Sequence, residues 1–108
     1  MSKVHHIIRN SAVALATLAM AHGAWAQADE ARAKKIAGGS CFLCHGANGE
    51  STSEAFPRLA GQHAGYIEQQ LKLFRAGHRG NSPMMNQIAD RMSDSDIKAV
   101  SDYAAGLR

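Results

Sequence analysis

The sequence lacks a clustered basic face and lacks a sustained run of alternating apolar and polar residues. Its 108 residues carry a formal net charge of +3, and Lys3 and Arg9 supply two of those positive charges, which leaves about +1 on the rest of the chain. Proteins that bind nucleic acids usually gather basic residues on one face, so this class of function is disfavoured. Without a strand pattern or an internal repeat, the chain is expected to be helical.

A long apolar run is also missing. Residues 11–21 (SAVALATLAMA) are uncharged and apolar, but about eleven residues are too few to cross a bilayer of about 30 Å as a helix. Two basic residues precede this stretch, and AWA at 24–26 matches the small-x-small pattern of a cleavage site. We predict a cleaved secretory signal peptide over residues 1–26, hence an exported chain, and one domain over residues 27–108. The alternative is an uncleaved membrane anchor.

Large apolar side chains are scarce in the predicted domain. Its roughly 82 residues contain three phenylalanines and two tyrosines. A domain of this size commonly needs a disulfide, a metal or a cofactor to supplement its core. We therefore expect a large apolar group to complete the core.

Three helices are expected from the spacing of apolar residues and from their end signals. The first should close at Gly38 and Gly39, and the third should begin at a capping box in which Ser93 pairs with Asp96. The expected ranges are 29–38, 64–76 and 95–105.

Two long irregular segments should separate these helices. Residues 45–63 are rich in Gly and Ser and contain Pro57, and residues 77–85 contain two Gly and Pro83. Long irregular segments in a small domain are usually functional, so we expect them to surround a ligand.

The chain has only two cysteines, Cys41 and Cys44, and His45 follows directly. A disulfide between them is compatible with export. A redox dithiol would sit in a strand–helix–strand unit, which the sequence does not predict. A structural zinc site needs four ligands, and only the isolated His63 and His78 are available to join His45.

Cys-x-x-Cys-His is also the attachment pattern of c-type haem, and this interpretation is favoured. Two thiols separated by two residues can add across the two vinyl groups on one edge of the porphyrin. The histidine that follows can then place its imidazole under the iron. No other cysteine competes for this role.

CFLCH (41–45), AFPRLAGQ (55–62) and PMMNQIADRMSDSDI (83–97) resemble a small bacterial class I cytochrome c. The similarity is to the short single-haem periplasmic type and to one half of its two-haem relatives. The resemblance implies an all-α fold, the small cytochrome c fold, with three main helices and long loops wrapped around one covalently attached haem c.

The resemblance also implies roles for particular residues. Cys41 and Cys44 would form the thioethers, and His45 would be the proximal axial ligand of the iron. In the family, a proline carbonyl accepts the other ring N–H of this histidine, and Pro57 occupies that place.

The second axial ligand implied by the resemblance is a methionine. Met85, in the loop before the third helix, is the expected ligand and Met84 is the second choice, whereas Met92 is expected in the core. The methionine that does not bind iron should pack on the haem edge. His63 and His78 are expected to be exposed and not to bind iron.

The first and third helices should pack against each other, with Tyr103 as the aromatic partner on the third. Relatives often carry glycine at this contact, where the chain has Ala33 or Ala37. The contact is therefore expected to be looser, or shifted toward Gly38.

The implied function is that of a soluble periplasmic electron carrier that is not an enzyme. It would exchange electrons with respiratory complexes or a terminal oxidase through transient docking. Phe42, Leu43 and the methionine pair should line the exposed rim, with Lys72, Arg75 and Arg79 either assisting docking or forming a solvated face. The alternatives are a cytochrome subunit of a dehydrogenase, or a haem sensor or peroxidase with a displaceable methionine.

Overall fold

The computed structural model describes residues 23–108, so most of the predicted signal peptide lies outside the described residues. Every regular element in this range is helical. None of these helices is both long and apolar enough to cross a membrane. The elements are a helix over 23–36, a π-helix at Ala37–Cys41, α2 at Phe42–His45, a 3₁₀ turn at Ala47–Gly49, α3 at Ala64–Arg75, α4 at Pro83–Asp90 and α5 at Asp94–Gly106.

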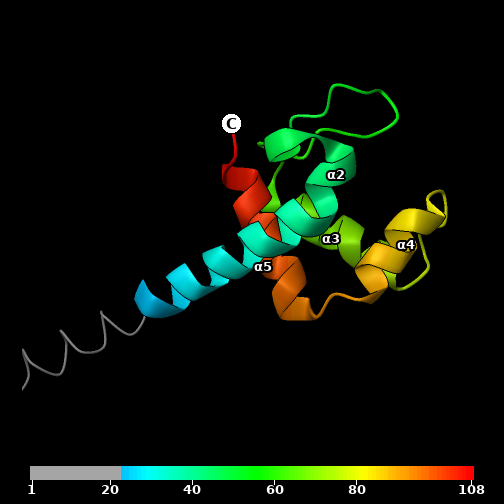
Figure 1. Cartoon of the computed structure of the whole chain (residues 1–108). Coiled ribbons are helices and arrows are strands. Elements are labelled where there is room, and N and C mark those ends of the chain that lie inside the picture. Colours follow the sequence, from blue (N-terminus) through cyan, green and yellow to red (C-terminus); the bar gives the residue numbers. More distant parts are fainter. Residues whose placement is uncertain (1–22) are drawn as a thin grey trace, which may run out of the picture.

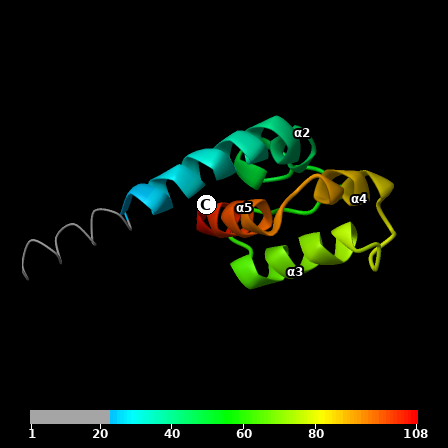
Figure 2. The same ribbon diagram turned by 90° about the horizontal axis from the view of Figure 1, so that it is seen from below.

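The helices are arranged around α5. The view from below shows α5 between the N-terminal helix and α3 (Figure 2). Helix α3 contacts both α5 and α4, and α4 lies at the far end from the N-terminal helix (Figure 1). The buried core cluster contains three alanines and no aromatic ring, in keeping with the scarcity of large apolar residues. Its members are Ala33, Ile67, Leu71, Met92, Ile97, Ala99, Val100 and Ala104.

The expected packing of the first helix on the third is confirmed, but its position differs. Ala33 is fully buried in the core cluster that α5 shares, and the Phe42 and Tyr103 rings lie 6.5 Å apart. Gly38 is exposed, and a Cβ atom there would have no neighbour within 4 Å. The expected shift toward Gly38 is therefore wrong, because the alanine methyl group is already small enough for this crossing.

The first helix does not end at Gly38 and Gly39 as predicted. It continues through one π-helical turn, in which the Phe42 N–H donates to the Ala37 carbonyl, and then through α2. Both glycines lie inside this π-helical turn, and neither has a positive φ. The helix ends only at Gly46, whose φ of 83° leaves the helical region.

The other two predicted helices are confirmed within one residue at each end. Helix α3 ends before Gly77, which has a φ of 76°. At the start of α5 the Ser93 hydroxyl accepts a hydrogen bond from the Asp96 N–H, and the Asp96 carboxylate accepts one from the Ser93 N–H. Both bonds satisfy N–H groups that a helix start leaves unpaired.

Helix α4 replaces part of the loop expected over residues 77–85. The Ser82 hydroxyl accepts from the Met85 N–H at 3.4 Å, and Pro83 occupies the first helical position. Proline suits this position because its missing N–H would be unpaired there anyway. Met84 and Met85 therefore lie in the first turn of a helix, not in a loop.

Candidate functional site

One cavity of about 400 Å³ lies between the Cys-x-x-Cys-His segment, the loop that follows it, and helices α3, α4 and α5. It brings Cys44 and His45 together with Met84 and Met85, which are about forty residues away along the chain. Most of its wall is apolar. Apolar residues from all five of these elements line it: Phe42, Leu59, Ile67, Leu71, Phe74, Ile88 and Val100.

His45 is the last residue of α2 and is buried, with 7% of its surface exposed. Its Nδ1 lies 2.7 Å from the carbonyl oxygen of Pro57. Because a carbonyl oxygen can only accept, Nδ1 carries the proton, and Nε2 keeps its lone pair free for a ligand bond. The Phe56 ring stands edge-on to the imidazole at 6.2 Å and 69°.

The loop after α2 carries Pro57 to His45 through backbone hydrogen bonds. The Ser51 N–H donates to the His45 carbonyl at 2.8 Å. The Gly49 carbonyl accepts from the N–H groups of both Leu59 and Ala60, at 2.9 and 3.1 Å. These bonds close the loop on itself, so the position of Pro57 depends on the backbone and not on long side chains.

Cys41 and Cys44 both line the cavity as free, half-buried thiols. Burial raises the pKa of the Cys41 thiol above its ordinary value, so at neutral pH this group is protonated. The structure offers no support for a zinc site, because no group of three or more His, Cys, Asp or Glu gathers within residues 23–108. The strand–helix–strand setting of a redox dithiol is likewise missing from that range.

The three methionines within residues 23–108 differ in burial. Met85 is half-buried and packs against the core cluster, whereas 55% of the surface of Met84 is exposed. Met92 belongs to the core cluster, although it also reaches the cavity wall. Met85 is thus the methionine of the pair whose side chain is held by the protein interior.

The charged side chains on the cavity wall are two arginines, and no carboxylate lines it. The Arg79 guanidinium lies 4.4 Å from the centre of the Phe74 ring and donates to Gln70 at 2.7 Å and to Asn81 at 3.2 Å. Arg58 donates to a backbone carbonyl. Neither arginine forms an ion pair within the described residues, so this wall favours a ligand with anionic substituents.

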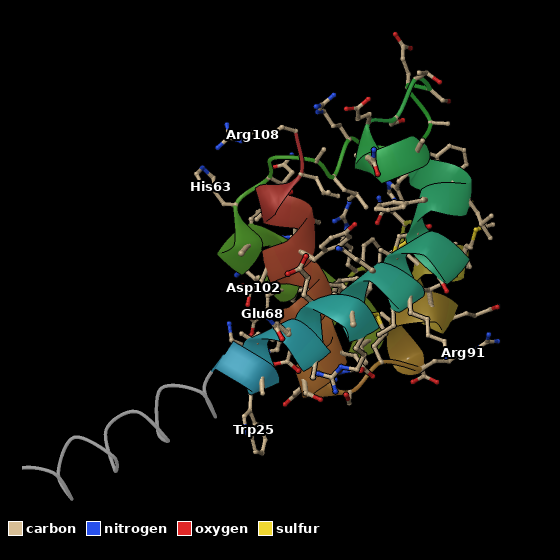
Figure 3. The ribbon with its side chains drawn as sticks, turned by 60° about the vertical axis from the view of Figure 1, so that its left-hand side comes forward. Trp25, His63, Glu68, Arg91, Asp102 and Arg108 are labelled. Carbon is tan, nitrogen blue, oxygen red and sulfur yellow. The ribbon has the colours of Figure 1, made fainter. Side chains whose placement is uncertain are left out.

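Other residues singled out from the sequence lie away from the cavity. His63 and His78 are exposed, as expected, and neither lines the cavity. The side chain of His63 points outward in Figure 3. Leu43 was expected beside Phe42 on the rim, but it is 78% exposed and does not line the cavity, because the two residues face different sides of α2.

Sequence reasoning missed the contributions of α3 and of Arg58, and it named Arg79 only as one of three basic residues for docking, for a solvated face or for the propionates. Ile67, Leu71 and Phe74 follow each other at helical spacing, which predicts one buried face but does not say what that face contacts. Arg58 and Arg79 carried no pattern that linked them to each other. Only the folded chain brings these side chains to one wall.

The cavity fits a haem group. It presents two thiols and an imidazole from one segment, thioethers from α4, an apolar wall for the porphyrin faces, and two unpaired cations for its carboxylates. A zinc ion would find too few ligands here.

Comparison with known proteins gives the same answer. The chain is 46% identical over 82 residues to cytochrome c4 of Azotobacter vinelandii, a match that covers 70% of this chain and 39% of that protein. It is 39% identical over 67 residues to cytochrome c-554(548) of Halomonas halodenitrificans, covering 60% of this chain and 81% of that protein.

The crystal structure of reduced recombinant cytochrome c4 from Pseudomonas stutzeri superposes with a TM-score of 0.67 at 37% identity, covering 76% of this chain and 50% of that one. The chain thus spans half or less of the cytochrome c4 proteins that it matches. The profile of the cytochrome c family matches residues 30–107. The chain therefore belongs to the cytochrome c family and carries a covalently attached haem c.

Proposed function

We propose that this electron-transfer cytochrome is a soluble periplasmic carrier whose single haem is held between His45 and Met85. One observation supports the proposal most directly. His45, oriented by Pro57, and the half-buried Met85 line the same cavity. Met84, at 55% exposure, is the second choice for the distal ligand.

The residues that would hold the haem divide between two walls. Cys41 and Cys44 would form the thioethers, with His45 Nε2 and the Met85 sulfur as axial ligands. When bound, the haem supplies one-electron chemistry through the ferric and ferrous states of its iron. If His45 and Met85 both bind the iron, these two side chains would leave it no position for a substrate.

The surroundings favour a carrier over an enzyme or a sensor. The weakly donating thioether and the apolar wall both disfavour the ferric state, which carries one more positive charge, and so raise the reduction potential. The wall contains no Asp or Glu and no histidine except His45. A peroxidase would need a carboxylate or a second histidine in that position to move protons near neutral pH.

Arg58 and Arg79 would neutralise the haem carboxylates. Arg79 is the better placed of the two, since it is half-buried and held by the Phe74 ring and two side-chain amides. Lys72 and Arg75 are already paired, with Glu68 at 2.6 Å and Asp94 at 2.5 Å. They therefore fit the solvated-face interpretation better than a role in the cavity.

Export to the periplasm would leave the packed part of the chain intact. All of residues 23–32 are exposed, and within the described residues Ala33 is the first that is buried. Cleavage before Gln27 would therefore remove only exposed residues from the described helix. Trp25, just before the cut, is 77% exposed and points away from the fold (Figure 3).

Docking would use the apolar side chains that remain exposed around the cavity. Phe56, Tyr66 and Met84 line it and are 36%, 51% and 55% exposed. Small, weak interfaces of this kind suit redox partners that must separate after each transfer. Respiratory complexes and a terminal oxidase are the partner classes we propose.

Optical spectra of the matured protein, oxidised, reduced and reduced with carbon monoxide, test this function. Low-spin bands, a weak far-red band from methionine sulfur on ferric iron, and no carbon monoxide shift are expected. Met85→Ala should remove the far-red band, lower the reduction potential and open the iron to carbon monoxide. Met84→Ala is the control and should keep the band. A high-spin wild-type spectrum would contradict the carrier function, and loss of the band only in Met84→Ala would reassign the ligand.

A further inference from the structure

Asn86 uses its side chain to join three separate segments. Its Nδ2 donates one hydrogen bond to the Phe74 carbonyl at 2.7 Å and another to the Arg79 carbonyl at 2.8 Å. Both protons of the amide are therefore used. Phe74 lies in the last turn of α3, Arg79 lies in the turn that follows, and Asn86 lies in α4.

The two carbonyls that Asn86 contacts lie where the regular hydrogen bonding of α3 ends. The Phe74 carbonyl also accepts from the Gly77 N–H at 3.2 Å, and the Arg79 carbonyl lies in the irregular turn that follows. In Figure 1 this turn reverses the chain at the far end of the fold, between α3 and α4. The amide thus fixes the distance between the end of α3 and the start of α4.

Helix α4 depends on such links because it is short. Its eight residues are fewer than an isolated helix needs to be stable in water. Its cap is weak, since the bond from the Met85 N–H to the Ser82 hydroxyl is 3.4 Å long. Within α4, Ala89 is the one fully buried residue, and the apolar contacts of the half-buried Met85 and Ile88 with the core cluster add to the link that Asn86 makes.

We propose that Asn86 is a positioning residue that keeps Met85 directed at the haem iron. Met85 directly precedes it in the same helical turn, so a shift of α4 relative to α3 would move the methionine sulfur. Without the two hydrogen bonds, the methionine should leave the iron more readily. This inference rests on the proposed function, in which a methionine of α4 is the distal ligand.

Asn86→Asp in the haem-loaded protein tests the inference. The shape is kept, but a carboxylate only accepts, so both hydrogen bonds are lost. Displacement of the methionine by added imidazole should become roughly tenfold to a hundredfold faster, as expected for two hydrogen bonds of ordinary strength. Loss of the far-red band reports the displacement, and the reduction potential should fall as well.

Two control variants distinguish a positioning role of Asn86 from the effect of the added negative charge and from a general loss of stability. Gln87→Glu makes the same amide-to-carboxylate change on the exposed neighbour and should exchange at the wild-type rate. Ile97→Val weakens the core away from the cavity wall, and it should lower the melting temperature without faster exchange. If Asn86→Asp does not mature, Asn86→Ser, which keeps one donor, should show a smaller acceleration.

The possible outcomes are distinct. Wild-type exchange rates in Asn86→Asp or Asn86→Ser would overturn the positioning role, and so would equal acceleration in Ile97→Val. A wild-type protein without the far-red band would instead contradict the methionine ligand, and with it both the proposed function and this inference.

Discussion

The two walls of the haem cavity are held by different means. The proximal wall, with the Cys-x-x-Cys-His segment and Pro57, continues an unbroken helix and is closed by backbone hydrogen bonds from Ser51 and to Gly49. The distal wall is an eight-residue helix, tied to α3 by the side-chain amide of Asn86. Most substitutions leave backbone hydrogen bonds in place, whereas a single substitution at Asn86 removes the hydrogen bonds of its side chain. The difference suggests that ligand exchange and tuning of the potential belong to the distal wall.

The largest effect is expected from removing a haem-attaching cysteine of the proximal wall. Cys44→Ala should leave most of the protein without covalent haem, while Met85→Ala should keep it, because only the proximal wall is bonded to the porphyrin. The chain without haem should be largely unfolded, since its own core cluster contains no aromatic ring. Mass spectrometry would measure attachment and circular dichroism the fold. A cooperatively folded, helical haem-free chain would contradict the second expectation.

An intermediate effect is expected from a substitution that strains the backbone of the proximal wall but leaves haem attachment possible. Gly49 has a φ of 69°, and a Cβ there would lie 3.1 Å from Leu59 Cβ and 3.2 Å from the Ala60 nitrogen. Gly49→Ala should lower the free energy of unfolding by about 1–3 kcal/mol. Denaturant titration measures this.

The same variant sharpens the comparison when its imidazole exchange is also followed. Gly49→Ala should lower the free energy of unfolding and leave the rate of methionine displacement at the wild-type value. Asn86→Asp should accelerate methionine displacement and lower the free energy of unfolding by less than Gly49→Ala does. Equal acceleration in both variants would mean that the two walls are coupled and that the division between them is wrong.

The smallest expected effect lies outside both walls, at the start of α5. The hydrogen bond from the Ser93 N–H holds the pKa of Asp96 below its ordinary value, and Arg32, 3.7 Å away, acts in the same direction. A carboxylate with a lowered pKa stabilises the fold above its unfolded pKa of about 3.9, and this contribution is lost as pH falls through the folded pKa.

Asp96→Asn should therefore cost less than about 1 kcal/mol at neutral pH. The difference from wild type should shrink as the pH is lowered below about 4. Unfolding curves at several pH values would measure it. A difference that grows on acidification would contradict the assigned cause. Imidazole exchange should not change in this variant.

Much of the fold and of the proximal site could be predicted because the signals are local. The haem attachment motif, the capping box at Ser93 and the spacing of α3 each lie within a few residues. The family resemblance then pointed to Pro57, and its carbonyl does lie 2.7 Å from His45 Nδ1.

The remaining features could not be predicted because they arise from contacts between distant residues. Asn86 reaches carbonyls seven and twelve residues away, and Arg79 joins the cavity through the Phe74 ring. Helix α4 did have a local signal, in Ser82 as cap and Pro83 at the first helical position. The helix is only eight residues long, however, and the glycines and proline of residues 77–85 favoured a loop. The helix beyond Gly38 was missed because glycine usually ends helices.

The π-helical turn at Ala37–Cys41 sets the angular phase between the packing face and the haem face of one helix. Twelve residues separate Ala33 from His45, and at about 100° per residue a regular α-helix would place them about 120° apart. A π-turn takes up one extra residue, which brings His45 back to within about 20° of Ala33. The same helix can then press Ala33 on α5 and turn His45 into the cavity. The π-turn therefore accommodates one additional residue without loss of this phase, because with one residue fewer a regular α-helix would itself place the two side chains about 20° apart.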